Sequence, residues 1–447
     1  MPTILDLQRD LQFGRTTARA LVEQSLARIA DPDGEGPRAF VSVNAERARA
    51  GADLVDEARQ RGLPLPPFAG LPLAIKDLYD VKGELTRCAS HVRDGEAPAT
   101  EDAATVAYMR RAGFVVVGKT NMSEFAYSGL GANAHFPAPK SPWQREVGRV
   151  PGGSTSGGGV AVADGMAVAA LGSDTGGSCR IPAAFSGVVG FKPTSTRVSK
   201  RGVFPLSPTL DSMGPLANSV SCCAIVDSLL SGGEGDDEAA LPLEGLRIAV
   251  AEGGVDEGLD AAVAAAYAAA LVRLSNAGAR LTRVKFPEFA EMPHIFRNGS
   301  IVGAEAYQVH RKMMTTRREA YDPWVLSRLE TGATMLAADF VELLAERRRV
   351  AASVAARTRG FDAVALPTVA IVPPRFDELG DLDRSFAINR LCLRNTVIGN
   401  FLDRPSISIP CHVPGEAPVG FMLFGETGQD RRLFAVANAL ERAVRGS

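Results

Sequence analysis

The stretch PGGSTSGGGVAVADG (151–165), continued by MAVAALG (166–172) and SDTGGSCRIPAAFSGVVG (173–190), is the most distinctive part of this 447-residue chain. Eleven of its forty residues are glycine, and Ser154 and Ser178 each follow a Gly-Gly pair. Glycine at this density indicates backbone that turns sharply or approaches another group closely. The apolar run between the two turns predicts a buried element that holds two serine-bearing loops against each other.

A nucleophilic serine needs a base to take its proton, and the chain offers no histidine near these turns. No serine lies in a GxSxG elbow, and the SxxK pattern of class A β-lactamases is absent. Any base must therefore come from another part of the chain. The histidines stand outside glycine-rich segments, at positions 91, 135, 294, 310 and 412.

Lys76 is the candidate base, in the apolar run GLPLAIKD (70–77). Burial disfavours the charged ammonium and lowers the pKa of a lysine, so a neutral amine could accept a proton there. The alternative is a surface lysine at the end of a strand, paired with Asp77. Composition alone leaves both interpretations open.

The two serine turns also have two interpretations each. SDTGGS places consecutive backbone N–H groups at a glycine turn, and Pro182 suits the first turn of a following helix. Such amides can bind a developing oxyanion, with Ser178 as the nucleophile. Ser178 could equally be an incidental serine in a structural turn, and Ser154 by itself is a turn serine.

Bulk composition is that of a globular protein with a substantial core: 46% of residues are hydrophobic, 22% are charged, and the net charge is −2. We therefore expect neither a nucleic-acid partner nor attraction to an anionic membrane. The six cysteines show no CxxC pair or metal-ligand spacing, which predicts free, mostly buried thiols, no metal and no cofactor. We find no signal peptide, transit peptide or membrane span, so the expected compartment is the cytoplasm.

Hydrophobic patterning predicts alternating helices and strands, and hence a parallel or mixed sheet covered on both faces. GGEGDDEAA (232–240) is the best linker or surface loop. Helices are expected within 4–30, 45–61, 100–112, 252–274, 298–360 and 430–444, and strands within 70–83, 114–120, 246–251, 279–286, 361–371, 404–411 and 420–425. No segment looks like an independent module, which favours one large domain.

One segment imitates a phosphate-binding loop. AGFVVVGKT (112–120) fits the P-loop spacing of Gly113, Gly118, Lys119 and Thr120. A P-loop needs flexible glycine-rich backbone between its glycines, whereas these intervening residues are Phe-Val-Val-Val. We interpret the segment as a buried strand and reject nucleotide binding.

The separated motifs together resemble the amidase signature family. GLPLAIKD, PGGSTSGG and GSDTGGSCRIPAAFSGVVGFKPT carry Lys76, Ser154 and Ser178 in that order. The resemblance extends over most of the chain through GKTNMSEFAYSG (118–129), LDSMGP (210–215), ALPT (365–368) and PSISIPC…PVGFML (405–423). It is the set and order of these motifs, rather than any one of them, that makes the resemblance specific.

The resemblance implies an α/β fold with a large mixed β-sheet core sandwiched between layers of α-helices. A single amidase domain would occupy 1–447, with N-terminal helices in 1–65, the signature core in 66–230, and the remaining strands and substrate-pocket helices in 241–447. Residues 290–400 would line the acyl pocket.

The resemblance also implies a Ser–Ser–Lys triad. Ser178 would be the nucleophile, Ser154 the bridging serine reached through a cis peptide from Gly153, and Lys76 the terminal base. The oxyanion hole would be formed by the backbone N–H groups of Thr175, Gly176, Gly177 and Ser178.

Some neighbouring residues depart from the family pattern. Thr155 follows the bridging serine where a second serine is frequent, and Thr155 and Ile181 are our candidate substrate-binding residues. Ile181 stands where the A subunits of the amidotransferases carry glutamine, which argues against a glutamine substrate. Cys179 is expected to be a packing residue, and Arg180 to form a buried pair with Asp211 rather than a substrate clamp.

The function predicted is hydrolysis of a carboxylic amide through an acyl-serine intermediate, with release of ammonia or an amine. The alternatives are the A subunit of a glutamyl-tRNA(Gln) amidotransferase, a carbamate or aryl-acylamide hydrolase, and a non-catalytic binding protein on an amidase scaffold. The expected partners are a small-molecule amide and, at most, a second copy of the chain in a homodimer.

Overall fold

A single mixed sheet of eleven strands runs through the computed structural model, which describes residues 2–446. The strand order is β1-β3-β2-β4-β6-β5-β10-β11-β9-β7-β8. Strands from the N-terminal, central and C-terminal thirds of the sequence therefore share one sheet. The strands are β1 (Phe40–Val43), β2 (Pro72–Lys76), β3 (Val115–Thr120), β4 (Ala169–Asp174), β5 (Val189–Lys192), β6 (Ser212–Ala217), β7 (Arg247–Glu252), β8 (Arg280–Lys285), β9 (Ala363–Pro367), β10 (Ser406–Pro410) and β11 (Gly420–Phe424).

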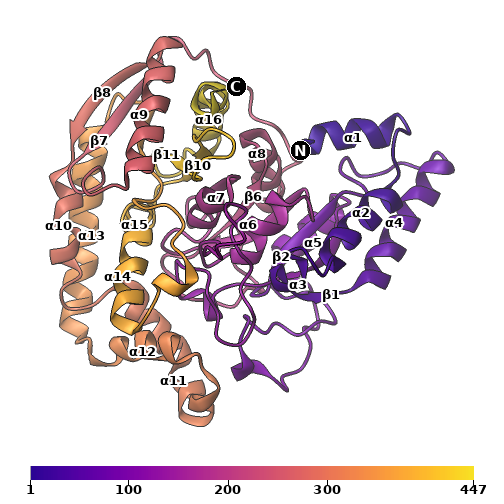
Figure 1. Cartoon of the computed structure of the whole chain (residues 1–447), viewed down its shortest axis with the longest axis horizontal. Helices are drawn as coiled ribbons and strands as arrows, with labels where there is room; N and C mark the ends of the chain where they lie inside the picture. The colour runs from indigo at the N-terminus through magenta and orange to yellow at the C-terminus, as the bar shows by residue number, and fades with distance from the viewer. Residues whose placement is uncertain (1, 447) are drawn as a thin grey trace.

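Helices surround this sheet, with α1, α2 and α4 toward one end and α10 and α13 toward the other (Figure 1). The α-helices are α1 (Ile4–Gln12), α2 (Ala18–Ala30), α3 (Gly36–Ala39), α4 (Ala45–Gln60), α5 (Ala104–Arg111), α6 (Ser156–Ala163), α7 (Arg180–Ser186), α8 (Val220–Leu230), α9 (Ala261–Asn276), α10 (Pro287–Ile295), α11 (Ile301–Arg317), α12 (Pro323–Thr331), α13 (Ala337–Thr358), α14 (Leu382–Leu393), α15 (Thr396–Phe401) and α16 (Asp430–Arg445).

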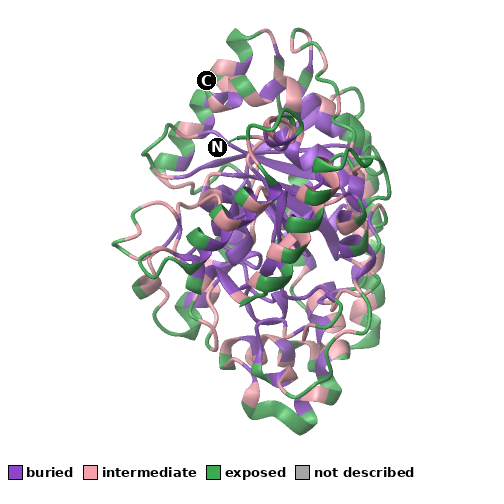
Figure 2. Ribbon diagram, turned by 90° about the vertical axis from the view of Figure 1, so that its right-hand side faces the viewer, coloured by how far each residue is buried: buried purple, intermediate pink, exposed green. Residues whose placement is uncertain are grey.

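Both faces of the sheet are covered, as the alternating pattern predicts. Leu73 and Ile75 of β2 pack into the cluster that contains α8, whereas Ala74 packs with Val160 of α6 on the other face. Successive side chains of a strand point to opposite faces, so a strand covered on both sides reads as a continuous apolar run. Figure 2 shows the buried strands inside a shell of largely exposed helices.

The parallel pairing of three central strands decides where the motif-bearing loops meet. β2 pairs in parallel with both β3 and β4, so the carboxyl ends of these strands lie at one edge of the sheet. The loops that follow β3 and β4, and the end of β2 itself, therefore converge there. In open α/β sheets this edge is the usual place for a ligand site.

The predicted helices and strands are present, with differences in their lengths, whereas β1, β5, β6 and α8 had no individual prediction; LDSMGP (210–215), expected as a turn, leads into strand β6. The expected strand within 70–83 is confined to Pro72–Lys76, and the residues that follow form turns. The segment that imitates a P-loop is the strand Val115–Thr120, as interpreted from its apolar residues. Helix α9 begins only at Ala261, after β7 ends at Glu252 and the chain bends in 253–258.

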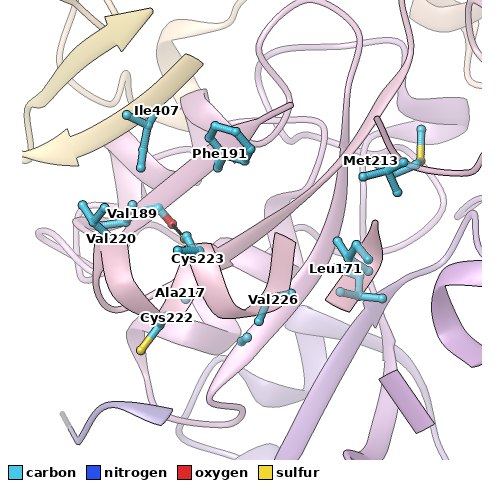
Figure 3. Packing of buried hydrophobic residues seen from close by; sticks show 14 of the residues in the cluster. Leu171, Val189, Phe191, Met213, Ala217, Val220, Cys222, Cys223, Val226 and Ile407 are labelled. Atoms are coloured by element: carbon cyan, nitrogen blue, oxygen red, sulfur yellow. Dashed lines mark hydrogen bonds between the residues drawn. The ribbon is translucent and has the colours of Figure 1, made fainter. Parts of the chain in front are cut away.

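Helix α8 connects the two ends of the chain. The Ile4 N–H donates to Cys222 Sγ, and the Val220 N–H donates to the Glu441 carboxylate of α16. All six cysteines are free and buried, as expected. Figure 3 shows Cys222 and Cys223 in the apolar packing of α8 against the sheet. No helix within residues 2–446 is long and apolar enough to cross a membrane.

We expect Phe191→Ala to lower the free energy of unfolding by about 3–5 kcal/mol, because it leaves a cavity in a core that cannot close around it. Phe191 is fully buried on β5, its ring centroid lies 4.2 Å from that of Phe434, and it pairs across the sheet with Ile407 (Figure 3). Urea unfolding followed by circular dichroism measures the change. Phe13→Ala is the control, since Phe13 is 64% exposed; equal effects of the two substitutions would contradict this account.

Candidate active site

Lys76 is the last residue of β2, and its side chain is fully buried. Its Nζ donates to Ser154 Oγ at 2.7 Å and to Ser173 Oγ at 2.8 Å. No carboxylate within residues 2–446 lies at ion-pair distance from this amine. The lysine therefore ends in a pocket of hydroxyl groups.

Burial lowers the pKa of Lys76 to about 8, against smaller opposing effects from charges that include Asp174 and Asp211. The alternative of a surface lysine paired with Asp77 is wrong. Asp77 points away from Lys76 and forms an ion pair with Lys119, with 2.8 Å between Oδ1 and Nζ. Asp77 begins the turn that follows β2, and its carboxylate also accepts from the Ala89 N–H at 2.8 Å, so it is held by groups other than Lys76.

Ser154 lies in the glycine turn that precedes α6, and its side chain is also fully buried. The Gly153–Ser154 peptide is cis, as the family resemblance implies. The loop after β3 anchors the turn: the Ser123 N–H donates to Ser154 O at 3.1 Å, and the Gly153 N–H donates to Gly129 O at 2.8 Å. The motif GKTNMSEFAYSG thus forms one wall of the site.

The two serine turns meet directly. The N–H of Thr155 donates to the carbonyl oxygen of Ser178 at 3.3 Å. α6 and β4 connect the turns and are almost wholly buried, as the apolar run between them predicts. Lys76, Ser154 and Ser178 are therefore brought together at one edge of the sheet.

Ser178 lies in the turn between β4 and α7 and is 5% exposed. Gly177 has a φ of +138°, and a Cβ there would lie 2.2 Å from Thr396 Oγ1, so this position requires glycine. Within residues 2–446, no protein acceptor takes the N–H groups of Gly176, Gly177 or Ser178. These amides are free to bind a ligand oxygen.

Side chains from distant elements hold this turn. Thr396 Oγ1 of α15 donates to Gly176 O at 2.6 Å, and Thr175 Oγ1 donates to Asp211 Oδ1 at 2.5 Å. Burial raises the pKa of Asp211 to about 6, although hydrogen bonds from Thr175 and from backbone N–H groups act in the opposite direction.

The expected pair between Arg180 and Asp211 is wrong. Arg180 is fully buried and binds Asp174 through two hydrogen bonds, from Nε at 3.0 Å and from Nη2 at 2.9 Å. Burial raises the pKa of Asp174, but the charge of Arg180 and its hydrogen bonds outweigh it and hold the pKa at about 2. Asp211 is satisfied by Thr175 and backbone N–H groups and needs no cation. Arg180 is thus committed to an intramolecular pair, which also binds Asn400.

The candidate substrate-binding residues Thr155 and Ile181 are both fully buried. Ile181 lies against the turn that carries Ser178, with its Cδ1 2.7 Å from the position that a Cβ of Gly177 would occupy. Thr155 Oγ1 has no hydrogen-bond partner among the described residues. Cys179 is buried, and burial raises the pKa of its thiol, which fits the packing role expected for it.

Sequence reasoning missed Ser173, the second hydroxyl bound to Lys76. Its only signal is a polar residue next to Asp174 at the end of the fully buried strand AALGSD (169–174). Thr396 and Asn400 were also missed, because they reach the site from more than two hundred residues away along the chain.

Arg328 of α12 is a further residue without a sequence signal. Its Nη1 donates to Tyr127 O, and its guanidinium carbon lies 4.0 Å from the ring centroid of Tyr127 and 4.9 Å from that of Trp324. Burial lowers the pKa of Arg328. No carboxylate of residues 2–446 forms an ion pair with it, and the buried Trp324 Nε1 beside it has no hydrogen-bond partner among those residues.

Tyr127, which contacts Arg328, leads into the loop that anchors the Ser154 turn. Tyr127 is two residues before Gly129, whose carbonyl oxygen accepts the Gly153 N–H.

Among the residues described, no group of three or more His, Cys, Asp or Glu side chains is arranged to hold a metal ion.

Comparison with known proteins identifies the family. The family model "Amidase" matches residues 20–434. A 2-amino-5-chloromuconic acid deaminase of Comamonas testosteroni is 34% identical over 411 residues, which are 91% of this chain and 88% of the relative. The A subunit of the glutamyl-tRNA(Gln) amidotransferase of Synechococcus sp. (strain WH7803) is 33% identical, and the match covers 99% of this chain and 97% of the relative. The chain belongs to the amidase family, hydrolases that act on amide C–N bonds.

Solved structures agree in fold. A crystal structure described as an amidase superimposes with a TM-score of 0.89 and 31% identity, covering 98% of this chain and 99% of the other. The peptide amidase from Stenotrophomonas maltophilia gives a TM-score of 0.81 and 25% identity, covering 99% and 97%. The predicted α/β fold, with its large mixed sheet between helical layers, is confirmed.

Proposed function

We propose that this chain hydrolyses carboxylic amides with Ser178 as nucleophile, Ser154 as proton carrier and Lys76 as base. One observation carries the proposal: a fully buried amine without a carboxylate partner donates to Ser154, whose turn adjoins that of Ser178. A desolvated lysine near neutrality can act as a base, as a solvated lysine cannot.

Acylation begins with two proton transfers. Neutral Lys76 takes the proton of Ser154 Oγ, which takes the proton of Ser178 Oγ. Ser178 Oγ attacks the amide carbonyl carbon and forms a tetrahedral intermediate. The C–N bond breaks as Ser154 returns a proton to the leaving nitrogen, leaving an ester on Ser178. A water molecule then repeats the sequence on the ester and releases the acid.

The free N–H groups of the turn Thr175–Ser178 would stabilise the negative oxygen of each tetrahedral intermediate. One such donor typically contributes about 2.7–4 kcal/mol to the transition state. The hydrogen bond that Thr396 donates to Gly176 O and the one that Asp211 accepts from Thr175 fix the turn beforehand, which preserves that contribution because no reorganisation is needed during the reaction.

Ser178→Ala is expected to lower kcat by about 10⁴-fold or more, because the attacking atom is lost. Ser186→Ala is a matched control on the following helix, since the buried Ser186 Oγ has no partner among the described residues. Amide turnover and intact-mass labelling by a fluorophosphonate measure both variants. Normal turnover by Ser178→Ala, or labelling of that variant at the normal rate, would refute the assignment of Ser178. A wild-type chain that neither turns over amides nor is labelled would favour the interpretation as a non-catalytic scaffold.

The pH profile of kcat/KM should rise through about pH 8 and level off above it. Lys76 acts as a base only when neutral, and burial sets its pKa to about 8, so raising the pH increases the active fraction. Steady-state assays from about pH 6 to 10, with circular dichroism to confirm that the fold persists, test this. A profile that falls with pH over this range would contradict a neutral Lys76 base.

We further propose that the acyl group of the substrate carries a carboxylate. Arg328 supplies a half-buried cation that has no acidic partner within residues 2–446, and the N–H of Trp324, unpaired among those residues, adds a second donor beside it. A carboxylate binds such donors through charge-assisted hydrogen bonds, which are stronger than neutral ones. The similarity to a deaminase of an amino-muconic acid supports the same class.

We expect succinamate to be hydrolysed with a kcat/KM at least about tenfold above that of the neutral, isosteric succinamide, the ratio that one charge-assisted hydrogen bond supplies. Arg328→Met should abolish this preference by raising KM for succinamate alone. Ammonia release measures both substrates. An unchanged preference in Arg328→Met would show that the guanidinium does not bind the substrate.

The remaining alternatives are separable by the same assays. Ammonia release by the isolated chain supports a stand-alone amidase, whereas glutaminase activity that depends on co-purifying partner chains supports the A subunit of an amidotransferase. Hydrolysis of one carbamate and one aryl acylamide, assayed beside the simple amides, tests the alternative of a carbamate or aryl-acylamide hydrolase. We retain a homodimer and a cytoplasmic location as proposals; light scattering tests the former, and the free buried cysteines agree with the latter.

A further inference from the structure

Glu305, on the second turn of α11, reaches across to the loop that precedes β6. Its Oε2 accepts from Ser207 Oγ at 2.5 Å and from the Thr209 N–H at 3.0 Å, and its Oε1 accepts from Thr209 Oγ1. One half-buried carboxylate thus takes three donors from residues nearly one hundred positions earlier in the chain. Hydrogen bonds to a charged acceptor are about twice as strong as neutral ones.

The loop held by Glu305 is a tight turn, Leu206–Asp211, closed from within by Asp211. The Asp211 carboxylate accepts from the Leu206 N–H at 3.0 Å and from the Ser207 N–H at 3.1 Å. The Asp211 N–H donates back to Ser207 O at 2.8 Å. Ser207 is therefore bound on one side by Glu305 and on the other by Asp211, so displacing it disturbs both carboxylates.

Asp211 connects the Leu206–Asp211 loop to the proposed oxyanion hole. It accepts from Thr175 Oγ1 at 2.5 Å, and Thr175 opens the turn that carries the free amides of Gly176, Gly177 and Ser178. Thr175 and Asp211 are only 2% and 4% exposed, so water cannot replace this bond readily. A continuous path runs from Glu305 through Ser207 and Asp211 to Thr175.

The other face of α11 borders the region that we propose for substrate binding. Gly303, one turn from the start of α11, lies beside Tyr127, since a Cβ on Gly303 would lie 3.8 Å from the Tyr127 hydroxyl. Tyr127 in turn packs under the guanidinium of Arg328. α11 therefore borders the proposed acyl pocket at Gly303 and is linked to the turn of the proposed oxyanion hole through Glu305, the Leu206–Asp211 loop and Thr175.

We infer that Glu305 is a positioning residue. Through the Leu206–Asp211 loop it fixes the turn that carries the proposed oxyanion hole. It thereby links the proposed acyl pocket to the rate at which Ser178 Oγ bonds to the amide carbon. This inference rests on the proposed function. The hydrogen-bond partners of Glu305 are Ser207 and Thr209 rather than the proposed reacting serines, so we expect its effect in the transition state rather than in ground-state binding. Misplaced N–H donors would weaken the developing oxyanion contact while the pocket still binds the amide.

Glu305→Ala should lower kcat by about 10–100-fold, less than the loss of a whole oxyanion donor, and leave KM within about threefold of the wild type. The rate constant for labelling of Ser178 by a fluorophosphonate should fall by a similar factor, because its phosphoryl oxygen also needs the oxyanion hole. Glu305→Gln keeps one acceptor oxygen and should recover part of both rates.

Two controls separate positioning from loss of fold. Glu319→Ala removes an exposed carboxylate just beyond α11 and should change neither rate. Ser207→Ala removes the same hydrogen bond from the loop side, so it serves if Glu305→Ala fails to fold. Combining Ser207→Ala with Glu305→Ala should add little to the loss in kcat, because both act on one path.

A wild-type kcat and labelling rate in folded Glu305→Ala would overturn the inference, and so would a loss confined to KM. Full additivity of the two substitutions would overturn it as well, since independent effects need no shared path. None of these results touches the proposed function, which fails only if Ser178 is not the labelled, essential residue in the wild-type chain.

Discussion

The environment of the Lys76 amine is the constraint on which the candidate site depends. The amine lies at the end of a fully buried strand, with hydroxyl groups as its hydrogen-bond partners. An ammonium ion in such a place loses its hydration and gains no anion, so the neutral form is favoured and the pKa falls to about 8. Lys119, on the adjacent strand, is equally buried but bound to Asp77. The two lysines differ in their partners, a carboxylate for Lys119 and two serine hydroxyls for Lys76.

The carboxylates around the site are each committed to another group. Asp174 is paired with Arg180, Asp77 with Lys119, and Asp211 with a hydroxyl and backbone N–H groups. Because a buried ion pair contributes little net stability, these pairs are better explained by what they hold in place. Asp174 and Asp211 flank the turn that carries Ser178, and the Cys179 N–H donates to Asp174 Oδ2 at its far end. The turn is thus fixed at both sides while its own amides stay free.

The sequence predicts the elements of this site well and their long-range partners poorly. The glycine turns, the buried strand ending at Lys76 and the buried connection between the turns follow from local patterns of apolar and glycine residues. The expectation that Arg180 pairs with Asp211 follows from the need of a buried cation for an anion. Two aspartates, Asp174 and Asp211, satisfy that condition. Only the register of β4 beside β6 selects Asp174. Ser173, Thr396 and Glu305 act through contacts between distant segments, for which a single sequence carries no pattern.

Exposure increases along the proposed proton path, and this order would explain why the path needs two serines where one histidine would serve elsewhere. Lys76 and Ser154 are fully buried, whereas Ser178 is 5% exposed. A lysine that itself touched the substrate would also touch water, and its pKa would return toward about 10.4, which leaves little neutral base near pH 7. Interposing Ser154 keeps the amine dehydrated while the reacting hydroxyl stays accessible. The buried relay therefore resolves two opposed requirements, a desolvated base and a substrate-facing nucleophile, that a single lysine beside the substrate cannot meet together.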